Sequence, residues 1–106
     1  MNEHLFASII LKKVDEFIDE LPGHVIGKIM DDIGAVLEGD YFNIHVKTIS
    51  GKIKELIVGD YRVVFFLNSN TIYFIHIFLK KTRKTPKKEI EYAEKIYKQI
   101  INYEKN

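Results

Sequence analysis

The chain has 106 residues, of which 46% are hydrophobic and 29% charged, and its formal net charge is +1. This length and composition indicate one folded domain over residues 1–106, and they exclude a disordered chain. The absence of cysteine excludes a disulfide framework, a thiolate zinc site and a cysteine nucleophile. No apolar run approaches the ~18 residues of a membrane span. We therefore expect a soluble protein of the cytoplasm with no membrane partner.

Two amphipathic helices are predicted in the first third of the chain. Apolar residues recur at steps of three and four over Phe6–Leu21 and again over Val25–Leu37, which is the spacing of one helix face. Pro22-Gly23 ends the first helix and Gly39-Asp40 the second. The short connection predicts an antiparallel helix hairpin. Before it, Met1–Leu5 could form a short edge strand.

The middle of the chain predicts a three-stranded antiparallel meander. Ile53–Val58, Tyr61–Leu67 and Thr71–Leu79 are dense in residues that favour strands. Gly59-Asp60 and Asn68-Ser69-Asn70 are suitable hairpin turns between them. The last two strands are apolar on both faces, so we expect the helix hairpin to cover one face of the sheet. A final helix or a partner should cover part of the other face.

A third helix is predicted after a basic segment. Thr85 can serve as its N-cap and Pro86 as its first residue, and an apolar stripe then runs over Ile90–Ile101. Lys87 and Lys88 lie in the first turn, where the helix dipole favours acids, which hints at another use for them. The predicted fold class is α+β, with a helix hairpin and a C-terminal helix on a small antiparallel sheet.

Charge is divided unevenly along the chain. Residues 1–44 carry 3 Lys or Arg against 9 Asp or Glu, whereas residues 45–106 carry 13 against 6. The densest run, Lys80–Lys88, has six cations in nine residues and no acid. The run could be a solvated basic loop, but its position after the last strand makes a polyanionic partner a reasonable expectation.

Further cations lie inside the meander and could join this run in one groove. Arg62 is the main candidate, and its alternative interpretation is an ion pair with Glu55, because a two-residue turn at Gly59-Asp60 places both on one face. The same register places Lys52 and Lys54 on the opposite face, so they could join only at an edge or through a bulge. The cations of the exit loop are Lys80, Lys81, Arg83 and Lys84.

These residues resemble the RelE/ParE toxin superfamily, and within it the HigB-like, phage-derived toxins of type II toxin–antitoxin modules. The resemblance lies in Glu55–Ile57, Tyr61–Phe66 and His76–Ala93, which includes the segment Lys-Lys-Thr-Arg-Lys-Thr-Pro. It covers residues 50–100 closely and the two N-terminal helices only in architecture. It implies a microbial-RNase-type α+β fold.

The resemblance also implies an activity: a metal-independent endoribonuclease without cofactors that cuts messenger RNA on the ribosome. A 2′-OH attacks the adjacent phosphorus, and fixed cations stabilise the charge on the phosphoryl oxygens. Arg62, Lys81 and Arg83 are the expected catalytic residues. The residues expected to bind RNA or its phosphates are Lys52, Lys54, Lys80, Lys84, Lys87, Lys88 and Tyr92.

Two departures leave the general acid and base open. Glu55 stands where RelE members carry a lysine, and Tyr92 is only the nearest counterpart of their tyrosine. His76, among apolar neighbours, is interpreted as a packing residue. Two rival functions are a ParE-like inhibitor of DNA gyrase and a non-catalytic module that binds an antitoxin. The implied partners are a cognate antitoxin with a helix-turn-helix domain, the ribosome and mRNA.

Overall fold

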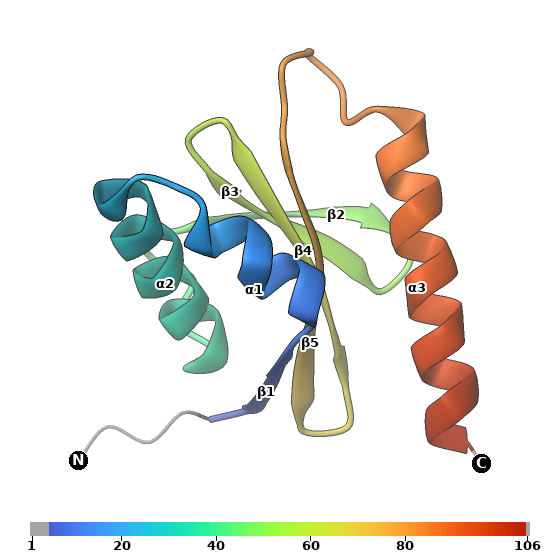
Figure 1. The fold of residues 1–106 in the computed structure, drawn as a ribbon. Helices are drawn as coiled ribbons and strands as arrows, with labels where there is room; N and C mark the ends of the chain where they lie inside the picture. The colour runs from blue at the N-terminus through green and yellow to red at the C-terminus, as the bar shows by residue number, and fades with distance from the viewer. Residues whose placement is uncertain (1–4, 106) are drawn as a thin grey trace.

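Five strands form one sheet with helices on both faces (Figure 1), in the computed structural model that describes residues 5–105. The strands lie in the order β1–β5–β4–β3–β2. Their bounds are β1 Ala7–Ile10, β2 His45–Ser50, β3 Ile53–Val58, β4 Tyr61–Asn68 and β5 Thr71–Leu79. The helices are α1 Lys12–Asp19, α2 Gly23–Leu37 and α3 Lys87–Lys105. The predicted α+β class is confirmed.

The predicted meander is confirmed in β3, β4 and β5, which are antiparallel neighbours. Val58 lies opposite Tyr61 across the first turn, so Gly59 and Asp60 form a two-residue hairpin connection. Gly59 has φ 59°, a left-handed conformation that glycine adopts without steric cost. The second turn places Ser69 at φ 56°. Both tight turns fix the register of β4, which carries the arginine of the predicted site.

The N-terminal segment corrects the prediction of a helix over 6–21. Residues 7–10 form β1, which pairs in parallel with β5, so the sheet is not wholly antiparallel. The Ala7 N–H donates to the Asn70 carbonyl at 2.9 Å and the Leu11 N–H to the Phe74 carbonyl at 3.0 Å. These bonds to an open strand edge override the helical spacing of the apolar residues. The edge strand expected at Met1–Leu5 falls largely on residues 1–4, which lie outside the described residues.

Strand β2 was not predicted. It pairs antiparallel with β3, with Val46 opposite Leu56 and an irregularity between Thr48 and Ser50. Half of β2 is polar and exposed, namely His45, Lys47 and Thr48, so it lacks the apolar run by which buried strands are recognised. The Ser50 hydroxyl donates to Glu94 at 2.5 Å, which ties this edge of the sheet to α3.

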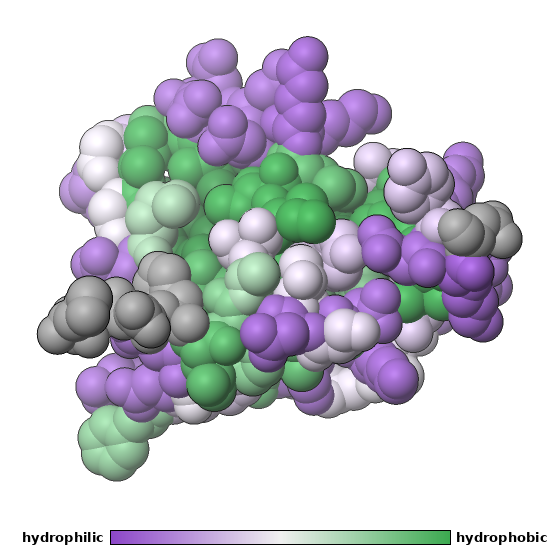
Figure 2. Space-filling model, turned by 90° about the horizontal axis from the view of Figure 1, so that it is seen from below, coloured by the Kyte–Doolittle hydropathy of each residue, from purple (hydrophilic) through white to green (hydrophobic). Residues whose placement is uncertain are grey.

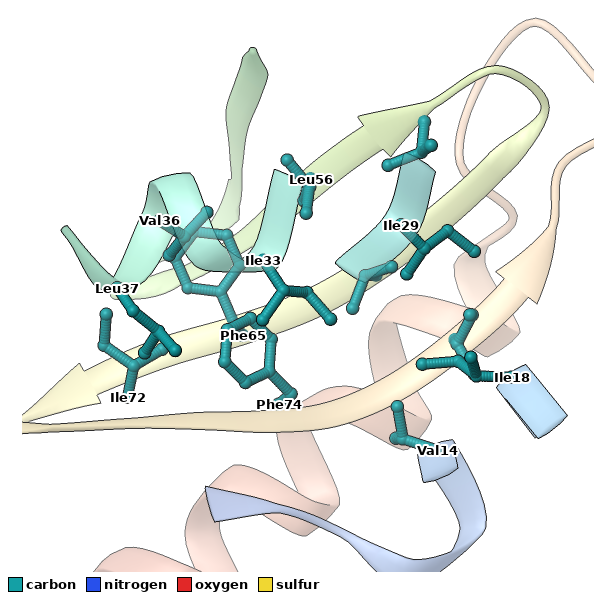
Figure 3. Packing of buried hydrophobic residues seen from close by; sticks show 13 residues of the cluster. Val14, Ile18, Ile29, Ile33, Val36, Leu37, Leu56, Phe65, Ile72 and Phe74 are labelled. Atoms are coloured by element: carbon teal, nitrogen blue, oxygen red, sulfur yellow. The ribbon is translucent and has the colours of Figure 1, made fainter. Parts of the chain in front are cut away.

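One face of the sheet is covered by α1 and α2, as predicted. Figure 3 shows their side chains pointing onto those of β3, β4 and β5. Phe65 and Phe74 lie at the centre, with ring centroids 5.7 Å apart. The buried cluster of this face comprises Val14, Ile18, Ile29, Ile33, Val36, Leu37, Leu56, Val58, Val63, Phe65, Ile72, Phe74 and Ile77. Asp32 of α2 is buried as well, and its carboxylate pairs with Lys28 at 2.8 Å.

The opposite face packs against α3, which confirms that a final helix covers it. Ala93 is fully buried there, and the Tyr97 ring lies edge-on to Phe66 at 4.7 Å. The buried cluster of this face comprises Ile53, Val64, Phe66, Tyr73, Ile75, Phe78 and Ala93. None of the helices in residues 5–105 is long and apolar enough to cross a membrane.

Apolar side chains remain exposed at the end of the sheet that carries β1 and the β4–β5 turn. Figure 2 views the molecule from this end and shows hydrophobic residues between hydrophilic ones. Leu5 is 61% exposed, and Ile9 and Leu67 are each 42% exposed. We call these three exposed residues the apolar end. Ile9 lies beside Tyr73 of the α3 face, whereas Leu67 lies opposite Ile72 of the other face.

Candidate nucleic-acid interface

A groove of about 550 Å³ opens where β5 leaves the sheet, and we call it the basic groove. Four cationic side chains and one acid line it. The lining residues are Asp60, Arg62, Leu79, Lys80, Lys81, Thr82 and Arg83. Such an excess of positive charge in a concave surface attracts anions and favours phosphate.

The loop that carries most of these cations is held by short bonds. The Lys80 N–H donates to the Asp60 carbonyl at 2.7 Å, which joins the end of β5 to the β3–β4 turn. The Thr82 hydroxyl donates to the Lys84 carbonyl at 2.6 Å, which closes a local turn. Lys81 and Arg83 are therefore presented from a folded loop whose two sides are anchored.

Arg62 reaches the basic groove from β4 and is fixed by backbone carbonyls. Its Nη1 donates to the Gly59 carbonyl at 2.8 Å and to the Tyr61 carbonyl at 3.0 Å. Its Nε is buried without a hydrogen-bond partner and lies 3.9 Å from Glu55 Oε1. The alternative interpretation of Arg62, an ion pair with Glu55, is thus present in the structure, although no hydrogen bond joins the two groups. The same arginine also lines the groove.

Glu55 is fully buried on the α3 side of the sheet. Its carboxylate accepts bonds from the Thr85 hydroxyl at 3.1 and 3.3 Å. A buried carboxylate without such donors would lose a large part of its solvation energy. The bond therefore stabilises the charge and pins the end of the basic loop to β3.

This contact corrects the prediction that Thr85 caps α3 with Pro86 as its first helical residue. The helix begins at Lys87, and the Pro86 carbonyl accepts the N–H groups of Glu89 and Ile90 at 3.0 and 3.3 Å. Pro86 therefore occupies the cap position, and the Thr85 hydroxyl serves the buried Glu55. The sequence pattern did not show that a carboxylate thirty residues away competes for this hydroxyl.

A second polar cluster lies beside Arg62 on the same face. His76 lies opposite Val64 and Phe78 lies opposite Arg62, so His76 and Arg62 are diagonal neighbours. His76 Nε2 lies 2.9 Å from Glu89 Oε1. The imidazole ring also stacks on Phe78 at 5.3 Å. His76 therefore packs as expected, and it also pairs with a carboxylate from α3 that sequence reasoning did not select.

Tyr92 lies in this second cluster rather than in the basic groove. Its ring centroid is 4.6 Å from that of His76, and both residues line a cleft of about 160 Å³ between α1 and α3. Lys13 of α1 lines the same cleft. A histidine, a carboxylate and a phenol are thus gathered next to the arginine, which is a set capable of proton transfer.

The remaining predicted cations are not gathered in the basic groove. Lys52 and Lys54 line a separate groove of about 410 Å³ with Phe6, Tyr41 and Phe65. The Lys54 ammonium donates to the Thr48 hydroxyl at 3.1 Å. Three further predicted cations are exposed on the loop and the first turn of α3 without lining the basic groove: Lys84, Lys87 and Lys88. Residues 5–105 contain no cluster of three His, Asp or Glu that could hold a metal ion.

Residues 16–98 match the model of a family described as phage derived protein Gp49-like (DUF891). Among solved structures, the chain is similar to one from the RelB-RelE antitoxin-toxin complex of Methanococcus jannaschii, with 20% identity and a TM-score of 0.58. That alignment covers 67% of this chain and 88% of that chain. A chain of the archaeal RelE-RelB complex from Pyrococcus horikoshii OT3 gives 19% identity and a TM-score of 0.63, over 76% of this chain and 99% of that chain. No curated protein matches the sequence.

Proposed function

Since this chain belongs to the Gp49-like family of phage-derived proteins, we propose that it is the toxin of a toxin–antitoxin module and cleaves messenger RNA on the ribosome. The resemblance to the RelE superfamily is confirmed by the family match and by the fold shared with chains of two RelB-RelE complexes. Cleavage of mRNA on the ribosome is the part of the proposal that extends beyond the family match. A protein with this activity would act in the cytoplasm, where ribosomes are.

The observation that carries this proposal is the basic groove with Arg62 fixed at its edge. In the proposed reaction, a ribose 2′-oxygen loses its proton and forms a bond to the adjacent phosphorus. The bond from phosphorus to the 5′-oxygen breaks, and that oxygen gains a proton. The products are a 2′,3′-cyclic phosphate and a 5′-hydroxyl. Negative charge grows on the phosphoryl oxygens in the transition state, where preorganised cations are most effective.

We assign the phosphate clamp to Arg62, Lys81 and Arg83. Arg83 can bind phosphate through two parallel N–H groups, whereas lysine acts as a point charge. Arg62 offers its Nη2 group, because its Nη1 donates to two carbonyls and its Nε is buried beside Glu55. Arg62 is preorganised by its bonds to two carbonyls, and the groove brings Lys81 and Arg83 to the same surface. Lys80 lines this groove as well and adds to its field.

The other cations are proposed to contact RNA outside the reacting phosphate. Lys84, Lys87 and Lys88 extend the positive surface from the loop to the first turn of α3. Lys52 and Lys54, in their own groove, would meet a different part of the RNA. Tyr92 belongs to the proposal through its contact with His76, next to the arginine rather than in the groove.

The proposed partner is an antitoxin that covers both charge and apolar surface. Because the basic groove and the apolar end lie at opposite ends of β5, the antitoxin would contact each with a different part of its chain: an acidic segment at the groove and an apolar one at Leu5, Ile9 and Leu67. The two similar structures are of RelB-RelE complexes, one of them described as an antitoxin-toxin complex, which supports a partner of this kind. By resemblance, that antitoxin carries a helix-turn-helix domain.

A cell-free translation reaction tests the proposal. The purified protein is added, and mRNA ends are mapped by primer extension, with a ribosome-free sample alongside. New ends in phase with codons that appear only with ribosomes are expected. Lys81→Ala should lower their rate of formation at least about tenfold, whereas Lys98→Ala, which removes an exposed cation of α3, should not. Intact mRNA at high protein concentration would contradict mRNA cleavage and favour a gyrase inhibitor or a binding module.

A further inference from the structure

A second groove adjoins the basic groove and shares two of its residues. It has a volume of about 330 Å³, within the range of roughly 300–1,000 Å³ typical of small-molecule sites. We call it the base groove. Its lining residues are His24, Val25, Lys28, Val58, Gly59, Asp60, Tyr61 and Leu79. Asp60 and Leu79 also line the basic groove, so the two hollows adjoin at the end of the sheet.

The two grooves differ in chemistry. Arg62, Lys80, Lys81 and Arg83 make the basic groove strongly cationic. The base groove has apolar walls from Val25, Val58 and Leu79 together with the half-buried ring of Tyr61. An anion-binding site next to an apolar and aromatic site matches the alternation of phosphate and base along a single strand of RNA.

Tyr61 is held where a base could stack on it. Its ring lies edge-on to Phe17, with centroids 6.2 Å apart at 78°, and its carbonyl accepts a bond from Arg62. The residue that would stack on a base is therefore bonded directly to the residue proposed to bind phosphate. Because consecutive strand residues face opposite sides of a sheet, the Tyr61 ring lies on the side of α1 and α2 and Arg62 on the side of α3. A strand of RNA would contact both by passing over the end of the sheet at Asp60, which lines both grooves.

The polar groups of the base groove favour one base. Asp60 contributes a carboxylate, which only accepts hydrogen bonds and can accept two in parallel. Guanine presents two adjacent N–H donors, N1 and N2, on its Watson–Crick edge, while adenine and cytosine present one donor group beside an acceptor. The Asp60 backbone is fixed by the Lys80 bond at 2.7 Å and by the tight turn after Gly59.

The wall formed by α2 complements that acid. His24 and Lys28 line it and can donate to the guanine O6, which lies beside N1. Lys28 is also paired with Asp32 at 2.8 Å, which holds the lysine at the groove. One acceptor on the β3–β4 turn and donors on the facing helix thus match the order of groups along the guanine edge.

We propose that the base groove binds a guanine base of the RNA whose phosphate occupies the basic groove. This inference rests on the proposed function, since it takes RNA as the ligand of the basic groove. It makes Asp60 and Tyr61 determinants of sequence preference rather than of catalysis.

The test measures equilibrium binding of GMP, AMP, CMP and ribose 5-phosphate to the whole chain. GMP should bind about tenfold more tightly than AMP or CMP. Asp60→Asn should remove this preference, although the loss of a negative charge raises affinity for all four anions. The matched control Asp31→Asn, an exposed acid of α2, should leave the preference intact. Tyr61→Leu should bring the nucleotides toward the affinity of ribose 5-phosphate.

The outcomes separate this inference from the proposed function. If all nucleotides and ribose 5-phosphate bind equally and Arg62→Ala weakens all of them, the base groove is not a guanine site while the phosphate site stands. If GMP is preferred but Asp60→Asn retains the preference, the assignment to Asp60 is overturned. If none of the four binds, the phosphate site and the guanine site both fail.

Discussion

The two faces of the sheet differ in what they bury. Under α1 and α2 the side chains of the sheet are apolar, with Phe65 and Phe74 at the centre of the cluster, and the buried acid on that side, Asp32, lies on α2 and pairs with Lys28. Under α3 the sheet carries Glu55, Arg62 and His76 among apolar neighbours. Burying charge costs free energy that an apolar residue of the same size would not. The comparison indicates that the first face provides stability, whereas the second trades stability for a site.

The polar groups of the α3 face also explain how that helix is placed. Thr85 bonds to Glu55, and Glu89 pairs with His76. These two contacts hold the start of α3 against the sheet and keep the intervening segment next to Arg62. The polar groups Glu55 and His76, which are costly to bury, are thus the ones that position the basic loop.

The largest effect on stability is expected from a substitution in the core between the sheet and helices α1 and α2. Phe74→Ala removes a fully buried ring and should lower the free energy of unfolding by about 3–5 kcal/mol. Phe42→Ala, at a ring that is 89% exposed, should change it by no more than about 0.5 kcal/mol. Urea unfolding followed by circular dichroism measures both. Similar losses in the two variants would contradict the assignment of this face as the stabilising core.

A smaller effect on stability is expected at the hydrogen bond that joins Thr85, just before α3, to Glu55 of β3. Thr85→Val keeps the shape of the side chain but removes the donor to Glu55. Because the carboxylate stays buried, the free energy of unfolding should fall by about 1–3 kcal/mol. Thr85→Ser retains the hydroxyl and should lose much less. Equal stabilities of the Val and Ser variants in the same urea experiment would show that the bond contributes nothing.

The two basic surfaces can be compared through the salt dependence of RNA binding. Lys80 lines the basic groove, whereas Lys54 lines the separate one. Lys80→Ala should reduce the slope of log affinity for a single-stranded RNA against log salt by about 0.7, the value of one phosphate contact. For RNA short enough to occupy only the basic groove, Lys54→Ala should leave the slope unchanged. The reverse ranking would move the RNA site to the other groove.

The smallest expected effect appears at alkaline pH. Burial raises the pKa of Tyr73, and its hydrogen bond to Glu104 raises that pKa further. Above pH ~10 the unfolded chain loses this proton while the native state retains it, so stability should fall as pH rises. Tyr73→Phe should flatten this dependence, and Tyr103→Phe, at a ring that is 79% exposed, should not. Unfolding free energies at pH 8 to 11 measure the slope; identical slopes in all three proteins would contradict this account.

Where local pattern and tertiary pairing agreed, the sequence predicted the fold well. The alternation and turns of 53–79 predicted strands β3, β4 and β5, and the two-residue turn at Gly59-Asp60 predicted the shared face of Glu55 and Arg62. The register of β4 with β5 was not predicted, because Asn68 is paired with Thr71 and an irregularity follows Val64. Ile9 and Ile10 were wrongly predicted to be helical. Apolar spacing within a segment carries no information about an unpaired edge of β5, with which these residues pair. Strand β2 was not predicted, because it is stabilised by pairing with β3 and has no run of apolar residues of its own.

The candidate site was predictable in its charges and not in its long-range contacts. The basic run and Arg62 predicted a groove that binds anions. In the structure, Arg62, Lys80, Lys81 and Arg83 line one groove. The role of Thr85 depends on a carboxylate in β3, and the pairing of His76 depends on the side of α3 that faces the sheet. Contacts of this kind are set by packing, which sequence spacing does not encode.

The central claim is that the polar face of the sheet is a site of RNA cleavage built around Arg62. The most direct test is the rate at which Arg62→Ala cleaves mRNA in a ribosome-dependent reaction, with Arg62→Lys and the wild type measured in parallel. Circular dichroism first establishes that each variant is folded. The account predicts a rate about 100- to 1,000-fold below wild type for the alanine variant, with only partial rescue by lysine. A folded alanine variant that cleaves at the wild-type rate would contradict it.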